Sequence, residues 1–322
     1  MTLPLSIDLL SLLRCPRCRN SLKREEQGYV CPNCRRSFPQ ERGVTRFVDA
    51  SNYADSFGFQ WQRYARTQLD DAASDESDKD FRLKTGFTPE DLKGKLVLDV
   101  GCGMGRFADV ATRWGATVVG IDLSAAAEVA ARNLADRDFV ALQADVFALP
   151  FLPQSFDYIY SIGVLHHTPN CEQAVKSLPQ YLKPGGRLAV WLYSSYNPWY
   201  RFSDIYRRFT PRLPATTLHG ILRVAVPTIN AVDSALRVVP GIGRPLSGLV
   251  RLVLPVNRNP NPQWRVLDTF DWYSPKYQSK HSYEEVFRWF ESCGMEDLHV
   301  ADVPISVRGR KPSRREPSNG DH

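Results

Sequence analysis

Residues 97–107 read VLDVGCGMGRF, and this stretch decides the fold of the chain. An apolar run ends beside an acid, and glycines then follow at alternate positions, which is typical of a tight turn between a buried strand and a helix. Turns of this kind serve several cofactors that contain a nucleoside. A dinucleotide-binding turn needs Gly-x-Gly-x-x-Gly, but Arg106 stands where its third glycine is required. The dinucleotide interpretation therefore fails on spacing.

Short apolar segments alternate with helical stretches over residues 94–192. They include KLVLDVG, ATVVGIDLS, DFVALQADV, FDYIYSI and GGRLAVWLY. This alternation predicts an α/β fold with a doubly wound, mostly parallel sheet covered by helices. Ligands of such sheets bind beyond the carboxyl ends of the strands, near the point where the strand order reverses. A capped amphipathic helix at 282–294 and two short strands, DLHVADV and ISVRGRK, complete this domain.

Several motifs of this domain resemble the class I S-adenosylmethionine (SAM)-dependent methyltransferases. The first is the run Asp99, Gly101, Gly103, Gly105, and VVGIDLS, QADVFALPF, SFDYIYSIGVLHH and LKPGGRLAVW follow in the order and spacing of that family. The resemblance implies a Rossmann-like sheet of seven strands and SAM as the cofactor. The subgroup it resembles is ubiquinone-biosynthesis-like, or methyltransferase type 11. SIGVLHHTPN stands where enzymes that methylate adenine or glutamine amino groups carry an Asn-Pro-Pro-Tyr type motif.

The resemblance also implies a role for individual residues toward SAM. Asp122, at the end of the second strand, would accept both ribose hydroxyls, and Asp145 would take the adenine amine beside the backbone N–H of Val146. Asp99 would order the ammonium group or the water around it. In comparable methyltransferases the segment before the first strand folds over SAM, which adds Gln60 and Trp61. The expected SAM-binding set is Asp99, Gly101, Gly103, Gly105, Asp122, Leu123, Asp145, Val146, Ser161, Gln60 and Trp61.

Two Cys-x-x-Cys pairs near the N-terminus predict a metal site. Cys15 and Cys18 are followed, after twelve residues, by Cys31 and Cys34. Two such knuckles can point four thiolates at one centre, which is the tetrahedral set that structural zinc takes. Each pair has a proline after its first cysteine, which disfavours two redox pairs of thioredoxin type. The segment looks like the small zinc ribbon that accompanies many SAM-dependent methyltransferases.

Candidate acceptor-side residues follow from what methyl transfer requires. SAM carries a good leaving group, so the enzyme must align an acceptor, exclude water and remove a proton where the acceptor holds one. The histidine pair after the fourth strand lies at the carboxyl edge of the sheet, although such a histidine can also simply bind the following loop. The aromatic-rich segment 268–286 is a candidate substrate wall or a structural cluster. The candidate catalytic residues are His166, His167, Asp271, Tyr273 and His281.

Charge is distributed unevenly along a chain whose net charge is +6. Residues 198–265 hold ten arginines against Asp204 and Asp233, a segment charge of +8. Prolines at 240, 245 and 255 interrupt the pattern, so we expect an insertion of short helices. Basic amphipathic helices of this kind rest on anionic membranes, or their apolar faces pack on the sheet or on a second subunit. The acidic run at 70–80 predicts a solvated loop.

Six segments result from this interpretation. They are a zinc ribbon (1–47), a linker and cofactor lid (48–92), a SAM-binding core (93–197), an arginine-rich helical insertion (198–265), the completion of the core (266–312) and a disordered tail (313–322). The chain has no long uncharged apolar run and no secretory signal pattern. We therefore expect a cytoplasmic protein. For 198–265, peripheral contact with a membrane is the alternative to packing of its apolar faces on the sheet or on a second subunit, and the packing is the favoured interpretation.

The leading function is SAM-dependent methylation of a small-molecule acceptor, or of one linked to a lipid or glycan, at oxygen or carbon rather than nitrogen. The alternative is an rRNA or tRNA methyltransferase, because a ribbon before this core resembles certain bacterial ribosomal-RNA methyltransferases and a basic surface favours phosphate contact. Those relatives tend to carry histidine as the last zinc ligand, whereas this ribbon has four cysteines. A third hypothesis is a SAM-binding scaffold whose ribbon docks a partner.

Overall fold

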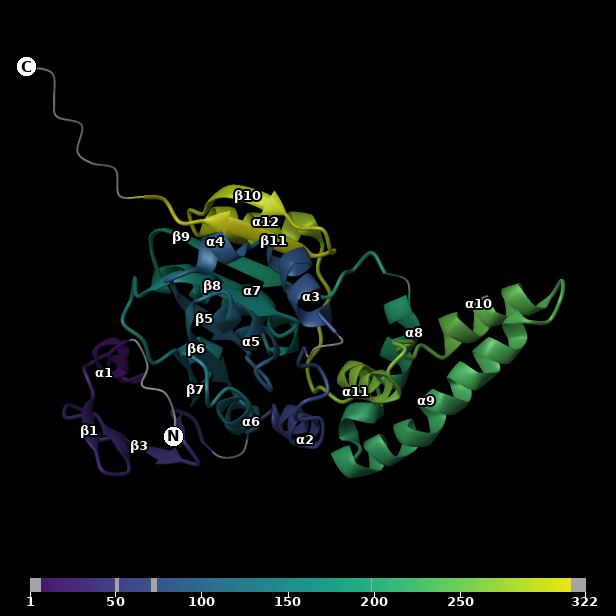
Figure 1. Cartoon of the computed structure of the whole chain (residues 1–322), viewed down its shortest axis with the longest axis horizontal. Helices are drawn as coiled ribbons and strands as arrows, with labels where there is room; N and C mark the ends of the chain where they lie inside the picture. The colour runs from purple at the N-terminus through teal and green to yellow at the C-terminus, as the bar shows by residue number, and fades with distance from the viewer. Residues whose placement is uncertain (1–6, 50–51, 71–73, 198, 314–322) are drawn as a thin grey trace, which may run out of the picture.

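The computed structural model describes residues 7–49, 52–70, 74–197 and 199–313. Its centre is a single sheet with the strand order β1-β2-β3-β4-β7-β6-β5-β8-β9-β11-β10 (Figure 1). The strands of the doubly wound domain are β5 (Leu96–Val100), β6 (Thr117–Asp122), β7 (Phe139–Gln143), β8 (Phe156–Ile162), β9 (Leu182–Trp191), β10 (Glu296–Val300) and β11 (Ser306–Arg310). Strands β5 to β9 pair in parallel, and β10 and β11 pair antiparallel at one edge. The expected fold class is confirmed.

The chain order of the strands creates a crevice at β5. From β5 the chain runs outward through β6 to β7, then returns across the sheet to β8 and continues to β9. The strand order therefore reverses between β6 and β8. Because these strands are parallel, their carboxyl ends open on the same edge of the sheet, where ligands of doubly wound folds bind.

Helices cover both faces of the sheet. One face packs against α7 (Cys171–Ser177) and α12 (Tyr283–Ser292), and the other against α3 (Glu76–Thr85), α4 (Pro89–Leu92) and α5 (Arg106–Arg113). The alanines of α6 (Ala126–Asn133) pack beside β7. Strand β5 is buried on both faces, which is why LVLDV reads as a continuous apolar run rather than as an alternating one.

The N-terminal ribbon extends the same sheet. It contains α1 (Leu9–Leu12), β1 (Lys23–Glu25), β2 (Gly28–Val30), β3 (Ser37–Glu41) and β4 (Val44–Arg46). Strand β4 pairs in parallel with β7, so the sheet is larger than the seven strands expected. Leu13 and Phe38 belong to the same hydrophobic core as Phe151. Arg42 and Arg46 also form ion pairs with buried Glu128 of α6, at 2.9 and 2.6 Å. The ribbon is thus joined to the sheet by a strand pair, apolar packing and ion pairs.

The acidic run at 70–80 is not a solvated loop where the structure describes it, and that expectation was wrong. Its second half begins helix α3, because the carboxylate of Asp70 accepts hydrogen bonds from the backbone N–H groups of Ser77 and Asp78. Asp70 also forms an ion pair with Arg113, and Asp80 forms one with Arg106. Residues 71–73 of the run lie outside the described residues. Local pairs such as Arg82 with Asp78 neutralise part of the run, and the distant partners Arg106 and Arg113 add to them.

The insertion forms longer helices than expected. Its helices are α8 (Trp199–Tyr206), α9 (Ala215–Arg237) and α10 (Gly243–Val253), and α11 (Pro262–Tyr273) crosses its expected end at residue 265. Pro227 lies inside α9, which has 23 residues. Pro227 is exposed, so water can satisfy the carbonyl group that loses its helical partner. Figure 1 shows α9 and α10 as a hairpin that projects away from the sheet.

One buried aspartate explains part of the seven-residue arginine spacing. Asp233 of α9 is 4% exposed and forms ion pairs with Arg237, Arg251 and Arg258 at 3.4, 2.8 and 3.5 Å. Ser247 of α10 donates a further hydrogen bond to it at 2.6 Å. The spacing therefore reflects a cluster of ion pairs and hydrogen bonds around Asp233 that joins α9 to α10.

The C-terminal part of the domain follows the sequence prediction. Ser282 and Glu285 form the expected capping box of α12. Strands β10 and β11 then return antiparallel beside β9. The tail expected at 313–322 lies, except for Ser313, outside the described residues. No helix in the described ranges is both long and apolar enough to span a membrane.

Candidate functional site

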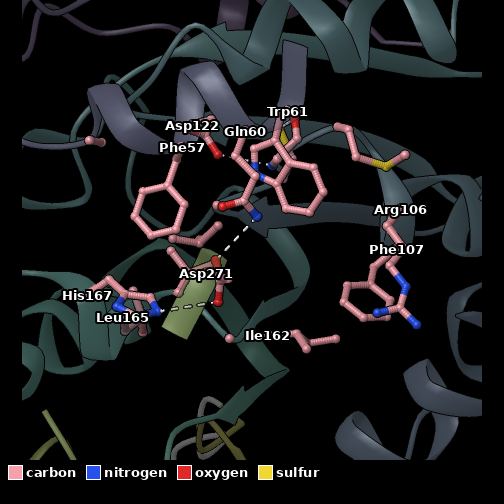
Figure 2. Close-up of a pocket in the computed structure, with 18 of the residues that line it drawn as sticks. Phe57, Gln60, Trp61, Arg106, Phe107, Asp122, Ile162, Leu165, His167 and Asp271 are labelled. Atoms are coloured by element: carbon pink, nitrogen blue, oxygen red, sulfur yellow. Dashed lines mark hydrogen bonds and ion pairs between the residues drawn. The ribbon is translucent and has the colours of Figure 1, made fainter. Parts of the chain in front are cut away.

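A cavity of about 500 Å³ lies at the carboxyl edge of β5, β6 and β8. Helix α2 (Asp55–Arg63), α11 and the first turn of α5 complete its walls. Figure 2 shows that its labelled side chains come from both sides of the opening, with Gln60 and Trp61 on one side and His167 and Asp271 on another. The cavity is therefore closed by one helix that precedes β5 in the chain, α2, and one that follows β9, α11.

The glycine turn forms part of this wall. Gly101 and Gly103 have φ values of 85° and 53°, which non-glycine residues rarely adopt. A Cβ atom on Gly101 would lie 2.4 Å from the side chain of Val164, and one on Gly103 would lie 3.2 Å from the ring of Trp61. The third glycine, Gly105, does not line the cavity; it allows α5 to begin close to Leu134. Two of the three glycines thus leave room for a ligand beside the backbone.

Four strand-end residues of the expected SAM-binding set also line the cavity: Asp122, Leu123, Asp145 and Val146. The carboxylate of Asp122 accepts hydrogen bonds from the backbone N–H and hydroxyl of Ser124, at 2.8 and 2.7 Å, and from the N–H of Gly103 at 3.0 Å. It therefore fixes the glycine turn while facing the cavity. Asp145 accepts the N–H of Phe147 at 3.0 Å and caps the short 3₁₀ turn Val146–Ala148.

Two expected SAM contacts lie behind the cavity wall. Asp99 is 3% exposed and accepts a hydrogen bond from the hydroxyl of Tyr160 at 3.0 Å. Burial raises the pKa of Asp99 to about 8. Ser161 is fully buried, and its hydroxyl donates to the carbonyl of Val100 at 2.8 Å. Neither residue lines the cavity, because their side chains point into the sheet domain.

Helix α2 covers the cavity. Phe57, Gln60 and Trp61 all line it. Gln60 is 1% exposed, and its Nε2 atom donates to Asp271 at 3.4 Å while its Oε1 atom has no hydrogen-bond partner among the described residues. Tyr64, one turn further along, instead bonds His219 at 2.8 Å in the insertion.

His167 lines the cavity, and one of its ring nitrogens has a lone pair to which no hydrogen-bond donor in the described ranges of the chain is bound. Its Nδ1 atom lies 3.0 Å from the carbonyl oxygen of Tyr277, and since a carbonyl can only accept, Nδ1 carries the proton. The other nitrogen, Nε2, is buried and has no hydrogen-bond partner in the described structure. It lies 3.9 Å from Oδ2 of Asp271. His167 therefore has the tautomer that a proton acceptor needs.

The surroundings shift the pKa values of this pair in opposite directions. Burial lowers the pKa of His167 to about 3. The hydrogen bond to the carbonyl of Tyr277 acts in the opposite direction but is the smaller effect. Burial raises the pKa of Asp271 to about 6, against hydrogen bonds from Tyr193, at 3.1 Å, and Gln60. Near neutral pH the pair is therefore a neutral imidazole beside a carboxylate.

The other three catalytic candidates do not line the cavity. His166 is fully buried, stacks on the ring of Tyr193 and accepts the N–H of that residue at 3.3 Å. The hydroxyl of Tyr273 donates to the carbonyl of Pro255 at 2.7 Å inside the insertion's core. His281 bonds Ser279 at 2.7 Å. Each has a structural partner that directs its side chain elsewhere.

Four charged side chains in the cavity wall were not predicted from the sequence: Asp80, Lys84, Arg106 and Asp268. Lys84 and Arg106 both pair with Asp80 at 2.9 Å, and the Arg106 guanidinium lies 5.0 Å from the ring centre of Trp264. Asp268 precedes Asp271 by one helical turn in α11 and also lines the cavity. Burial, together with the nearby carboxylate of Asp271, raises the pKa of Asp268 to about 7. The three-residue spacing of Asp268 and Asp271 indicates that both lie on one face of α11, but only if this segment is expected to be a helix.

The four ribbon cysteines form a metal centre. The sulfur atoms of Cys15, Cys18, Cys31 and Cys34 all lie within 4.8 Å of one another. Cys15 lies 3.5 Å from Cys34, and Cys18 lies 3.4 Å from Cys31. In each knuckle an arginine with positive φ donates its N–H to the first cysteine's carbonyl, Arg19 to Cys15 and Arg35 to Cys31. Four thiolates converging on one point fit structural zinc and leave no open position.

Comparisons with known proteins match the two segments of the chain that contain most of these residues. Residues 98–190 match the family described as methyltransferase domain, and residues 6–43 match the family described as Trm112p-like protein. The chain is 40% identical over 104 residues to methyltransferase GfsG of Streptomyces halstedii, covering 30% of this chain and 37% of that protein.

Two further relatives differ in what their names say they modify. The ubiquinone biosynthesis O-methyltransferase of Coxiella burnetii is 36% identical over 100 residues, covering 30% of this chain and 43% of that protein. The probable tRNA methyltransferase 9B of Homo sapiens is 34% identical over 111 residues, covering 34% and 23%. The chain thus spans less than half the length of each relative. Residues 98–190 form a class I SAM-dependent methyltransferase domain, preceded in this chain by a Trm112p-like zinc ribbon.

Proposed function

We propose that the protein transfers the methyl group of SAM to an oxygen or carbon atom of a small-molecule acceptor, or of an acceptor linked to a lipid or glycan. The observation that carries this proposal is the free Nε2 lone pair of His167, buried at the cavity beside Asp271. A base in this position suits acceptors that must lose a proton as they are methylated, such as phenols, other hydroxyls and acidic carbon atoms.

The cavity residues fit the parts of SAM. Asp122 would accept the ribose hydroxyls, and Leu123, Asp145 and Val146 would surround the adenine. Gly101 and Gly103 would give the methionine part the close backbone approach that a side chain would block. Gln60 and Trp61 of α2 would close over the cofactor. SAM, when bound, supplies a methyl group on a positively charged sulfur.

His167 would act as the general base. Its Nε2 atom would take the proton of the acceptor while the acceptor atom takes the methyl group. Burial disfavours the imidazolium that results, as the low pKa of His167 reflects, and the carboxylate of Asp271, ionised above pH values near 6, would offset this cost. The carbonyl of Tyr277 holds the ring in the required tautomer. Closure by α2 would keep water from competing with the acceptor.

An RNA methyltransferase is the second candidate function. Its support is the Trm112p-like ribbon, together with the basic residues of the insertion. In Figure 1 the ribbon and the α9–α10 hairpin lie at opposite ends of the molecule, with the sheet between them. An RNA held by both would have to pass across the sheet domain and place one base in the cavity. A lipid-linked acceptor requires only one binding surface for the membrane, and the segment 198–265 would provide it through peripheral membrane contact.

Transfer of a labelled methyl group tests both candidates. The purified protein would be incubated with methyl-labelled SAM and, separately, with polar metabolites, a lipid extract or total RNA. We expect label in the metabolite or lipid fraction, entering about 10²- to 10⁴-fold more slowly with the His167→Gln variant. Label that enters only RNA would replace the first proposal by the second. Binding of SAM without transfer to any fraction would favour a SAM-binding scaffold.

A further inference from the structure

The α9–α10 hairpin carries apolar side chains on its outside. Val224 and Ile242 are 69% and 65% exposed, and Val238, in the turn between the helices, is 80% exposed. The other large exposed apolar residues of this hairpin are Ile221, Val232, Val239, Leu246 and Leu249. We define these eight residues as the hairpin patch. Monomeric proteins rarely expose so many large apolar side chains together without a binding function.

The two helices are joined partly by polar rather than apolar contacts. Asp233 and Ser247 are buried between them, and Arg251 donates hydrogen bonds to both carboxylate oxygens of Asp233. Along α9, the apolar residues Leu218, Leu222 and Val226 face the core formed with α2 and α11. The hairpin patch therefore takes no part in the contacts around Asp233 or in the packing of α9 on the domain.

Free positive charge accompanies the patch. Both acidic residues of the insertion are already paired: Asp233 with its arginines, and Asp204 with Lys280. Two exposed arginines of the hairpin itself, Arg223 of α9 and Arg244 of α10, form no ion pair with the described residues, and neither do the exposed Arg208 and Arg212, which precede α9 in the chain. The outer surface of the insertion thus combines valine, isoleucine and leucine with unneutralised guanidinium groups.

We propose that the hairpin patch docks on the surface of an anionic phospholipid bilayer. The apolar side chains would enter the boundary between headgroups and acyl chains, and the free arginines would pair with lipid phosphates. The hairpin lies on the membrane rather than crossing it, in agreement with the absence of a spanning helix among the described residues. A second copy of the chain is a poorer partner, because it would bring the same positive charge to the contact.

The position of the turn fits this role. Figure 1 shows the α9–α10 turn as the part of the hairpin farthest from the sheet. Val238, Val239 and Ile242 lie at this turn, so they can enter a surface without a clash from the rest of the molecule. This inference does not depend on the proposed acceptor, since docking can be measured without methyl transfer.

Vesicle sedimentation tests the proposal with the full-length protein. The probes are vesicles of phosphatidylcholine alone and vesicles that also contain phosphatidylglycerol. We expect sedimentation with the anionic vesicles, weakened by salt. The double variant Val238→Ser/Ile242→Ser should bind them at least about tenfold more weakly. Val300→Ser, which removes an exposed apolar group of β10, is the matched control and should bind like the wild type.

Charge is tested separately. Arg223→Gln and Arg244→Gln should each weaken anionic-vesicle binding about fivefold, whereas Lys93→Gln, at an exposed position of the sheet domain, should not. Unchanged SAM affinity of every variant establishes that it is folded.

Three outcomes would overturn the proposal. The first is no binding to anionic vesicles by the wild type. The second is a wild-type dimer that the Val238→Ser/Ile242→Ser variant converts to a monomer without any vesicle binding, which would make a second copy the occupant. The third is RNA binding that requires Arg223 and Arg244 in a protein that ignores vesicles.

Discussion

The Nε2 atom of His167 lies 3.9 Å from Oδ2 of Asp271, although one residue follows the fourth parallel strand and the other lies in a helix after the insertion. This distance is longer than a direct hydrogen bond, so Nε2 keeps its lone pair for another partner. Asp271 is held at this position by the hydroxyl of Tyr193 and the amide of Gln60. The arrangement separates a proton acceptor from the charge that would stabilise it once protonated.

Replacing His167 should therefore abolish proton removal while leaving the cofactor in place. For His167→Gln we expect the rate of methyl transfer to fall by about 10²- to 10⁴-fold. SAM affinity, measured by calorimetry, should stay within about threefold of the wild type. The control is His281→Gln, because His281 does not line the cavity, and this variant should keep most of its activity. Equal losses in both variants would contradict the role of His167.

The rate should also depend on the ionisation of Asp271. Burial raises the pKa of this group to about 6, so its carboxylate is protonated below that pH and cannot stabilise an imidazolium. The rate should rise with pH through about 6 and then level. Asp271→Asn should lose this rise and have a low rate throughout. A rise that persists in Asp271→Asn would assign it to another group.

Asp122 links the cofactor to the glycine turn. Asp122→Ala should weaken SAM binding by about 3 kcal/mol or more, since it removes hydrogen bonds to a charged acceptor and also frees the N–H of Gly103. The matched control is Ser161→Ala, a residue next to the site whose hydroxyl bonds only the carbonyl of Val100 within the described structure. Calorimetric titration with SAM would measure both, and equal affinities of wild type and Asp122→Ala would refute this cofactor placement.

The sequence predicted the cofactor side of the cavity better than the acceptor side. Gly101, Gly103, Asp122 and Asp145 belong to one continuous run of strands and turns, so their spacing along the chain fixes where they lie in the sheet. Lys84 reaches the same cavity from helix α3, through contacts that no local pattern contains. The acidic run before it reads as a solvated loop because two of its partners, Arg106 for Asp80 and Arg113 for Asp70, are distant in the chain.

The angular positions of residues around α11 explain why Asp271 lines the cavity as predicted and Tyr273 does not. The sequence pattern does not mark this segment as a helix, so it does not show which of its polar and aromatic residues share a face. In a helix, Asp271 and Tyr273 point about 200° apart, whereas Asp268 and Asp271 lie on the same side. Asp268 and Asp271 accordingly line the cavity and Tyr273 does not.

Asp99 gives a pH dependence of stability. Burial raises its pKa to about 8 in the folded state, from an ordinary value of 3.8, so the folded protein holds a proton there that the unfolded chain releases. Its contribution is fully present below pH 3.8 and is lost as pH rises through about 8. From about pH 5 to about pH 8 the free energy of unfolding should fall by about 4 kcal/mol more in the wild type than in Asp99→Asn.

Denaturant titrations of both proteins across this range would measure the difference. Asparagine can still accept the hydroxyl of Tyr160, so the variant should fold, and it should bind SAM because Asp99 does not line the cavity. Parallel pH profiles of the two proteins would show that Asp99 is ionised in the folded state.

Zinc removal should destabilise the sheet domain as well as the ribbon. Strand β4 continues the sheet beside β7, and Glu128 of α6 is buried under Arg42 and Arg46 of the ribbon. In Cys31→Ala we expect loss of the metal and a fall in the free energy of unfolding of more than about 4 kcal/mol. Cys293→Ala, which changes a cysteine outside the metal centre, should retain one zinc per chain.

The two modules can be followed separately in the same Cys31→Ala protein. Zinc content reports the ribbon, and SAM affinity together with the unfolding transition reports the methyltransferase domain. If they form one folding unit, the loss of zinc lowers the temperature of the single transition and weakens SAM binding at temperatures near it. A variant that lacks zinc yet unfolds and binds SAM like the wild type would mean that the β4–β7 pair and the Glu128 ion pairs do not couple the ribbon to the sheet.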